Sequence, residues 1–136
     1  MNLDIQYKHS HEIRVRYGET DQMGYCYYGN YAEFLEVGRV EALRSKGITY
    51  RELEEIGIML PVLEFNIKYL APAKYDDQLR ILTNITKLKG TRLFFEYEIY
   101  NERNQKLVDA STTLVFVNSE SMKPIAAPEI FLNVFQ

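Results

Sequence analysis

The spacing of hydrophobic residues changes character near residue 30. Before that point, Ile13 and Val15 alternate with Arg14 and Arg16, and this period of two predicts a short strand over residues 11–17. After it, the apolar positions recur every three or four residues and predict one face of a long helix: Tyr31, Phe34, Leu35, Gly38, Ala42 and Leu43. The charged residues between them are expected to face mostly away: Glu33, Glu36, Arg39, Glu41 and Arg44.

Residues at both ends of this helix are typical of helix boundaries. Asn30, followed three residues later by Glu33, resembles a capping box. Gly47 suits the position just past a helix C-terminus, so the helix is expected over about residues 30–46. The same kinds of signal predict a second, shorter helix over residues 49–56.

The rest of the chain alternates largely with a period of two. Four strands are predicted, over residues 63–69, 79–88, 93–100 and 107–118. The turns between them are short, and short connections favour antiparallel neighbours. One long helix can cover one face of such a sheet, which predicts an α+β architecture: a curved antiparallel sheet wrapped around a central helix. One helical turn is also expected near residues 129–134.

Composition narrows the class of protein. The chain has 136 residues, of which 46% are hydrophobic and 26% charged, so a single globular domain over residues 1–136 is expected. No apolar stretch predicts a membrane span, and the N-terminus lacks the pattern of a secretory signal, so a cytoplasmic location is expected. A net charge of −3 argues against general nucleic-acid binding. One cysteine and two neighbouring histidines make a metal site an unfavoured hypothesis.

Asp21 is the clearest candidate for a reactive side chain, because it lies in a loop rich in Gly and Tyr directly before the long helix. A carboxylate there can stabilise the helix N-terminus through the macrodipole. It can also attack a carbonyl or activate water beside free backbone N–H groups that bind an oxyanion. Residue types alone leave both interpretations open. Cys26 is expected to be a small buried hydrophobic residue, since no base lies beside it in the sequence.

Two stretches of the sequence resemble the hotdog-fold acyl-CoA thioesterases. The first runs over residues 16–31 and continues into residues 34–36; it has an aspartate, a glycine three residues later and a short aromatic segment that enters the helix. The second covers residues 69–77. The resemblance extends over about residues 11–118 and is closest to the 4-hydroxybenzoyl-CoA thioesterase branch, which includes the Tol-Pal-associated thioesterase.

The resemblance implies a hotdog fold and hydrolysis of an acyl-CoA thioester to free acid and CoA, with no metal or organic cofactor. It makes Asp21 the catalytic carboxylate, as nucleophile or as general base. It places the backbone N–H of Tyr28 on the thioester carbonyl oxygen. Under that assignment the helix begins as much as one turn before Asn30.

Several other residues are candidate substrate contacts. Gly24 allows a turn with positive φ or a close ligand approach, and Tyr27 and Tyr31 belong either to the core or to a pocket wall. Glu36 either enters the acyl pocket or is a solvated helical glutamate. The family binds the nucleotide end of CoA near a basic strand turn, which here contains Lys87, Lys89 and Arg92; solvated basic turns are an equal alternative.

The resemblance also implies an assembly. The family joins two sheets into one continuous sheet with sites between the subunits, and it often packs two dimers together. A homodimer is therefore expected, with a dimer of dimers as its extension. A hotdog hydratase is disfavoured because no histidine follows His11. The remaining alternative is a non-catalytic hotdog protein that binds acyl-CoA or an aromatic ligand.

Overall fold

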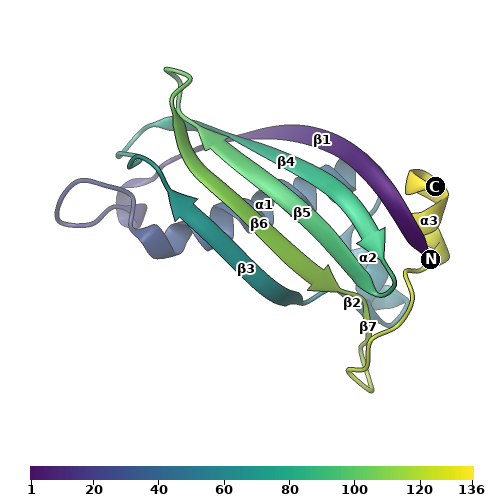
Figure 1. Cartoon of the computed structure of the whole chain (residues 1–136). Coiled ribbons are helices and arrows are strands. Elements are labelled where there is room, and N and C mark those ends of the chain that lie inside the picture. The colour runs from purple at the N-terminus through teal and green to yellow at the C-terminus, as the bar shows by residue number, and fades with distance from the viewer.

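One long helix lies against the inner face of a curved antiparallel sheet (Figure 1). The computed structural model describes all of residues 1–136. The strands are β1 (Asn2–Arg14), β2 (Ile58–Met59), β3 (Val62–Tyr69), β4 (Gln78–Lys89), β5 (Arg92–Tyr100), β6 (Lys106–Val115) and β7 (Val117–Asn118). The helices are α1 (Tyr31–Ser45), α2 (Tyr50–Glu55) and α3 (Glu129–Phe135), with 3₁₀ turns over Tyr17–Glu19 and Tyr28–Asn30. The predicted α+β architecture with a central helix is confirmed.

The order of strands in the main sheet is β1-β4-β5-β6-β3. The expectation that consecutive strands are neighbours is wrong for β3 and β4, which lie at different places in the sheet. The reason is that residues 70–77 cross the end of the sheet. Leu70 donates its N–H to the carbonyl of Leu107, and Asp76 donates to the carbonyl of Val15. This connection therefore leads from the β6 side to the β1 side, and leaves β3 as an edge strand with one neighbour.

The first strand is longer than predicted. It begins at Asn2 and ends at Arg14, so the predicted range of 11–17 was wrong at both ends. Half-buried and exposed residues alternate along its whole length, and it pairs with all of β4, from Asn2 opposite Lys89 to Arg14 opposite Gln78. The predicted last strand is also divided at Phe116: β6 belongs to the main sheet, whereas β7 pairs with β2 in a separate two-stranded sheet.

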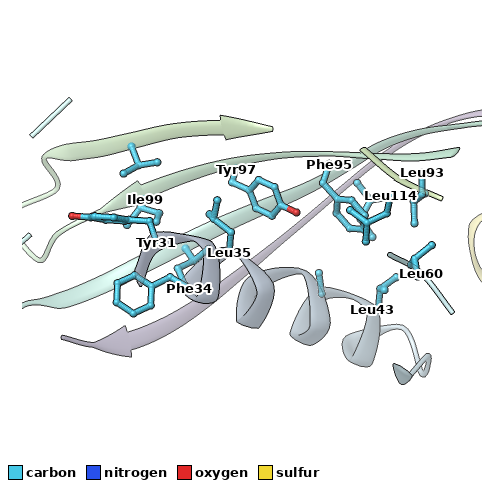
Figure 2. Packing of buried hydrophobic residues seen from close by; sticks show 14 of the residues in the cluster. Tyr31, Phe34, Leu35, Leu43, Leu60, Leu93, Phe95, Tyr97, Ile99 and Leu114 are labelled. Carbon is cyan, nitrogen blue, oxygen red and sulfur yellow. The ribbon is translucent and has the colours of Figure 1, made fainter. Parts of the chain in front are cut away.

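The apolar face of α1 is buried against the sheet, as predicted (Figure 2). Gly38 lies so close to β4 that a Cβ atom there would be 2.7 Å from Oγ1 of Thr83 and 2.8 Å from Cγ2 of Ile81. The helix ends at Ser45, and Gly47 has a φ of +82°, the left-handed conformation expected just past a helix. The backbone of α1 is therefore in close contact with β4 at Gly38.

Arg39 departs from the expected pattern, because its side chain is buried rather than solvated. It lies beside the phenol groups of Tyr50 and Tyr97, between α1, α2 and β5, and it makes no ion pair. Burial lowers the pKa of its guanidinium and the two phenols raise it by more, so the net shift is upward. Tyr50 of α2 and Tyr97 of β5 lie against the flank of α1 that carries Arg39, which the helical period of α1 alone does not indicate.

The inner row of β5 fills the centre of the core (Figure 2). Leu93, Phe95, Tyr97 and Ile99 are 0–2% exposed. Each such side chain contributes about 1.5–3 kcal/mol through burial. The hydroxyl of Tyr97 is satisfied within the core, since it forms a hydrogen bond of 2.6 Å with Oγ1 of Thr112. The predicted inner row of this strand is confirmed.

Candidate active site

The two sequence stretches that carry the resemblance pack against each other at one end of the sheet. Cys26 donates its backbone N–H to the carbonyl of Ala73 (2.8 Å). The N–H of Ala73 donates in turn to the hydroxyl of Tyr31 (3.2 Å). The hydroxyl of Tyr69, at the end of β3, donates to the carbonyl of Tyr28 (3.2 Å). The structure therefore joins two segments that are about forty residues apart in the sequence.

The carboxylate of Asp21 is held by its own loop. Its Oδ1 accepts from the backbone N–H groups of Met23 (2.9 Å) and Tyr25 (3.2 Å). The N–H of Gly24 donates to the carbonyl of Asp21 (3.0 Å), and Gly24 has a φ of +79°, so the predicted turn with positive φ is confirmed. No protein donor bonds to Oδ2. The loop thus orients the carboxylate through one oxygen and leaves the other free to react.

The start of α1 supplies free backbone N–H groups. A 3₁₀ turn over Tyr28–Asn30 precedes the α-helix at Tyr31. The helical conformation therefore begins two residues before the predicted Asn30, as a 3₁₀ turn, and the α-helix itself begins one residue after it. The first N–H groups of a helix have no acceptor one turn earlier, and Tyr28 occupies this position. Its side chain is exposed.

Asn30 does not form the predicted capping box. Its φ and ψ of −73° and −19° are already helical, and its side chain makes no cap hydrogen bond. Instead Nδ2 of Asn30 donates to the carbonyl of Glu19 (2.8 Å), and the N–H of Tyr27 donates to the same oxygen (2.8 Å). The 3₁₀ turn explains the difference, because a capping side chain needs an extended backbone at the N-cap.

Glu19 is a site residue that sequence reasoning missed. Its side chain is only 10% exposed, and its carboxylate accepts from the backbone N–H (2.7 Å) and the guanidinium (3.3 Å) of Arg16. This arrangement closes the 3₁₀ turn over Tyr17–Glu19. The sequence signal for this turn is a glutamate three residues after the position that precedes the turn, as in a capping box. Tyr69 was also missed, and its alternation on β3 gave no indication of its contact with Tyr28.

Burial keeps the side chains of Cys26 and Tyr31 in their neutral forms. Burial, and then the charge of Glu19, raise the pKa of the Cys26 thiol to about 11. Burial also raises the pKa of Tyr31 to about 12. Tyr31 is 2% exposed, so of its two predicted roles the structure supports the core. Cys26 is buried, as expected, and its thiol is a poor nucleophile at neutral pH.

Exposed aromatic side chains gather at the start of α1. The rings of Tyr27 and Tyr28 are 4.8 Å apart, and that of Tyr69 lies 6.3 Å from Tyr28. A Cβ atom at Gly29 would be 2.8 Å from the ring of Tyr27, so glycine lets this ring lie over the helix start. Glu36 is exposed on α1. These groups can contact a ligand from the surface.

The basic residues of the β4–β5 turn lie at the other end of the sheet (Figure 1). Lys87, Lys89 and Arg92 are exposed and form no ion pairs. Residue 14, from which the chain enters the Asp21 loop, pairs with residue 78, whereas residue 2 pairs with Lys89. At about 3.3 Å per residue, the length of β4 separates the two ends by roughly 35 Å. One chain therefore does not bring the basic turn to Asp21.

No group of three or more His, Cys, Asp or Glu side chains is arranged to hold a metal ion. None of the helices combines the length and the apolar composition that a membrane span requires.

Comparisons with known proteins identify the family. Residues 23–108 match the Thioesterase superfamily. The chain is 37% identical over 120 residues to YneP of Bacillus subtilis, covering 88% of this chain and 87% of YneP. It is 36% identical over 124 residues to the acyl-CoA thioester hydrolase YbgC of Escherichia coli O6:H1, covering 91% of this chain and 92% of YbgC. The DHNA-CoA thioesterase structure from Staphylococcus aureus has a TM-score of 0.88 at 33% identity, covering 93% of this chain and 85% of that one.

The protein therefore belongs to the thioesterase superfamily, and it has the hotdog fold of these thioesterases. It is a thioester hydrolase. The resemblance and the fold expected from the sequence are both confirmed.

Proposed function

We propose that this thioester hydrolase cleaves acyl-CoA esters, with Asp21 as the catalytic carboxylate and the backbone N–H of Tyr28 as the donor to the thioester carbonyl. The relatives in E. coli and S. aureus are named for acyl-CoA and DHNA-CoA hydrolysis. The observation that carries the proposal is the state of the Asp21 carboxylate. Two backbone N–H groups hold Oδ1 and no protein donor bonds to Oδ2, while the same loop leads into the 3₁₀ turn at Tyr28 that precedes α1.

The reaction can follow two routes that use the same groups. As a general base, Oδ2 takes a proton from water while the water oxygen attacks the thioester carbon. The carbonyl oxygen becomes an oxyanion, which the N–H of Tyr28 stabilises. The C–S bond then breaks, the acid is released, and the CoA sulfur takes up the proton.

As a nucleophile, Oδ2 attacks the thioester carbon itself. The C–S bond breaks to give a mixed anhydride between Asp21 and the acyl group, and the CoA thiolate leaves. Water then cleaves the anhydride and restores the carboxylate. Single-turnover hydrolysis in ¹⁸O-labelled water tests the nucleophilic route, because label enters the Asp21 carboxylate only when water attacks the Asp21 carbonyl of the anhydride.

The proposed site needs a second copy of the chain. A substrate with its thioester at Asp21 and its phosphates at a basic β4–β5 turn requires that turn from another subunit, since the two are roughly 35 Å apart along one β4 strand. The edge strand β3 supports a homodimer as well. Its inner face carries exposed apolar residues, including Leu63, Phe65 and Tyr69, and its backbone has a strand on one side only, so this edge favours pairing with another strand. Pairing of dimers into a tetramer extends this prediction.

A hydrolysis assay against a panel of acyl-CoA esters tests the function. The panel contains straight-chain and aromatic acyl groups, and free thiol is measured. We expect turnover of at least one class, with Tyr27, Glu36 and the aromatic side chains around Tyr28 contacting the acyl group. Tight binding of the esters with no release of thiol would support the non-catalytic alternative and contradict the proposal.

A further inference from the structure

We propose that Asn30 is a positioning residue whose side-chain amide holds the Asp21 loop against the peptide unit that carries the N–H of Tyr28. The inference rests on the proposed function, because it concerns the separation between a catalytic carboxylate and an oxyanion donor. Asn30 touches neither the substrate nor the reacting atoms in this scheme. It acts through its neighbours.

The side chain of Asn30 anchors the loop. Its Nδ2 donates to the carbonyl of Glu19 at 2.8 Å, two residues before Asp21. The N–H of Tyr27 donates to the same carbonyl at 2.8 Å. Both donors belong to the segment that leads into α1, and the acceptor belongs to the segment that leads into the Asp21 turn. The carbonyl of Glu19 therefore connects the Asp21 loop to the segment that carries the N–H of Tyr28.

The backbone of Asn30 orients the other half. Its N–H donates to the carbonyl of Tyr27 at 3.0 Å. That carbonyl and the N–H of Tyr28 belong to one planar peptide unit. The hydrogen bond from Asn30 thus sets the direction in which the Tyr28 N–H points, while the side chain of the same residue fixes the distance to the loop.

Helix capping does not account for this amide. Asn30 has helical dihedral angles and makes no side-chain cap hydrogen bond, and asparagine is a weaker helix former than alanine. Removal of the amide leaves the bond from Tyr27 to Glu19 in place, so the loop stays attached with less constraint. The expected result is misplacement of the reacting groups rather than unfolding. A misplacement of about 1 Å can cost about a hundredfold in rate.

The test compares Asn30→Ala with a matched asparagine outside the site. Asn101, in the β5–β6 turn, donates through Nδ2 to Gln105 (3.1 Å) and accepts from the N–H groups of Arg103 and Gln105 (3.0 Å each). We expect Asn30→Ala to lower kcat about tenfold to a hundredfold with little change in KM. Asn101→Ala should lower the unfolding temperature and leave kcat within about twofold.

Asn30→Asp adds a readout that a purely structural role would not move. The introduced carboxylate cannot donate to the carbonyl of Glu19 and repels it, so activity at neutral pH should fall at least as far as in Asn30→Ala. Once protonated, with an ordinary pKa of about 4, the carboxyl group can donate again. The ratio of variant to wild-type kcat should therefore rise as the pH falls toward that value, while the ratio for Asn30→Ala stays flat.

Hydrogen exchange over residues 19–28 provides a measurement that does not depend on activity. Asn30→Ala should accelerate exchange in this loop and leave β4 and β5 protected. A kcat within twofold of wild type for Asn30→Ala, or unchanged exchange in the loop, would overturn the inference. Absence of hydrolysis by the wild-type protein would instead refute the proposed function, and the exchange experiment would still decide whether the amide holds the loop. Should Asn30→Ala be insoluble, Asn30→Asp carries the same comparisons.

Discussion

Replacement of Asp21 by asparagine separates the two interpretations of this residue, as a turn former and as a catalytic group. The Oδ1 of an asparagine can accept the same two hydrogen bonds, from the N–H groups of Met23 and Tyr25. Asp21→Asn should therefore change the free energy of unfolding by less than about 1 kcal/mol. The substitution removes the negative charge and the nucleophilic oxygen, so kcat should fall at least about a hundredfold, which corresponds to about 2.7 kcal/mol.

Asp21→Ala is the matched variant, because it removes the turn contacts and the reactive oxygen together. Two hydrogen bonds at about 1 kcal/mol each predict a loss of about 2 kcal/mol in unfolding free energy. Its kcat should be about as low as that of Asp21→Asn, although the two variants differ in stability.

The assay combines chemical denaturation with steady-state release of thiol from the best acyl-CoA ester, for wild type and both variants. If Asp21→Asn hydrolyses this ester at the wild-type rate, Asp21 is a turn former and the catalytic assignment is wrong. If Asp21→Asn loses activity only in proportion to a loss of folded protein, the assignment of Oδ1 to the turn and of Oδ2 to the reaction is wrong as well.

Three further predictions concern other parts of the molecule. Replacing Lys87, Lys89 and Arg92 together by Ala should raise KM for CoA esters and weaken its dependence on salt, with a much smaller effect on a pantetheine ester that lacks the nucleotide; equal effects on both esters would exclude a phosphate contact. Phe65→Glu, on the inner face of β3, should shift the mass measured by light scattering from that of a dimer or tetramer toward that of a 16.0 kDa monomer, and should abolish activity. Lys68→Glu, on the other face of the same strand, should change neither. An active wild-type monomer would refute the predicted assembly. Because burial raises the pKa of Cys26 to about 11, a thiol-alkylating reagent should react far more slowly near pH 8 than with free cysteine, and faster as the pH rises toward that value; rapid labelling of the folded protein at pH 8 would contradict this environment.

The helices and most strands could be predicted from the sequence because their signals are local. The apolar face of α1, the inner row of β5 and the left-handed glycine at Gly47 all follow from residue spacing and backbone sterics. The same is true of Asp21 as the candidate carboxylate. Its loop contains the glycine with positive φ that turns the backbone N–H groups toward Oδ1.

Pairings between distant segments depended on the tertiary structure. The period of two does not say which strand a strand meets, and the crossing of residues 70–77 places β3 at the sheet edge rather than beside β4. Arg39 occupies a polar position by its helical period, yet it is buried beside Tyr50 of α2 and Tyr97 of β5. The spacing of residues predicts which face of a helix or strand is apolar. It does not predict which other elements pack beside that face.

The sequence by itself determined the α+β class, the central helix and the carboxylate loop, because each depends on neighbours within a few residues. Only the tertiary structure decided how that loop is held. The amide of Asn30, which suggested a helix cap in the sequence, instead bonds to Glu19, and Tyr69 reaches Tyr28 across the end of the sheet. Hydrogen-bond partners of polar side chains are set by which backbone groups folding brings within about 3 Å, and that choice is made between segments far apart in the chain.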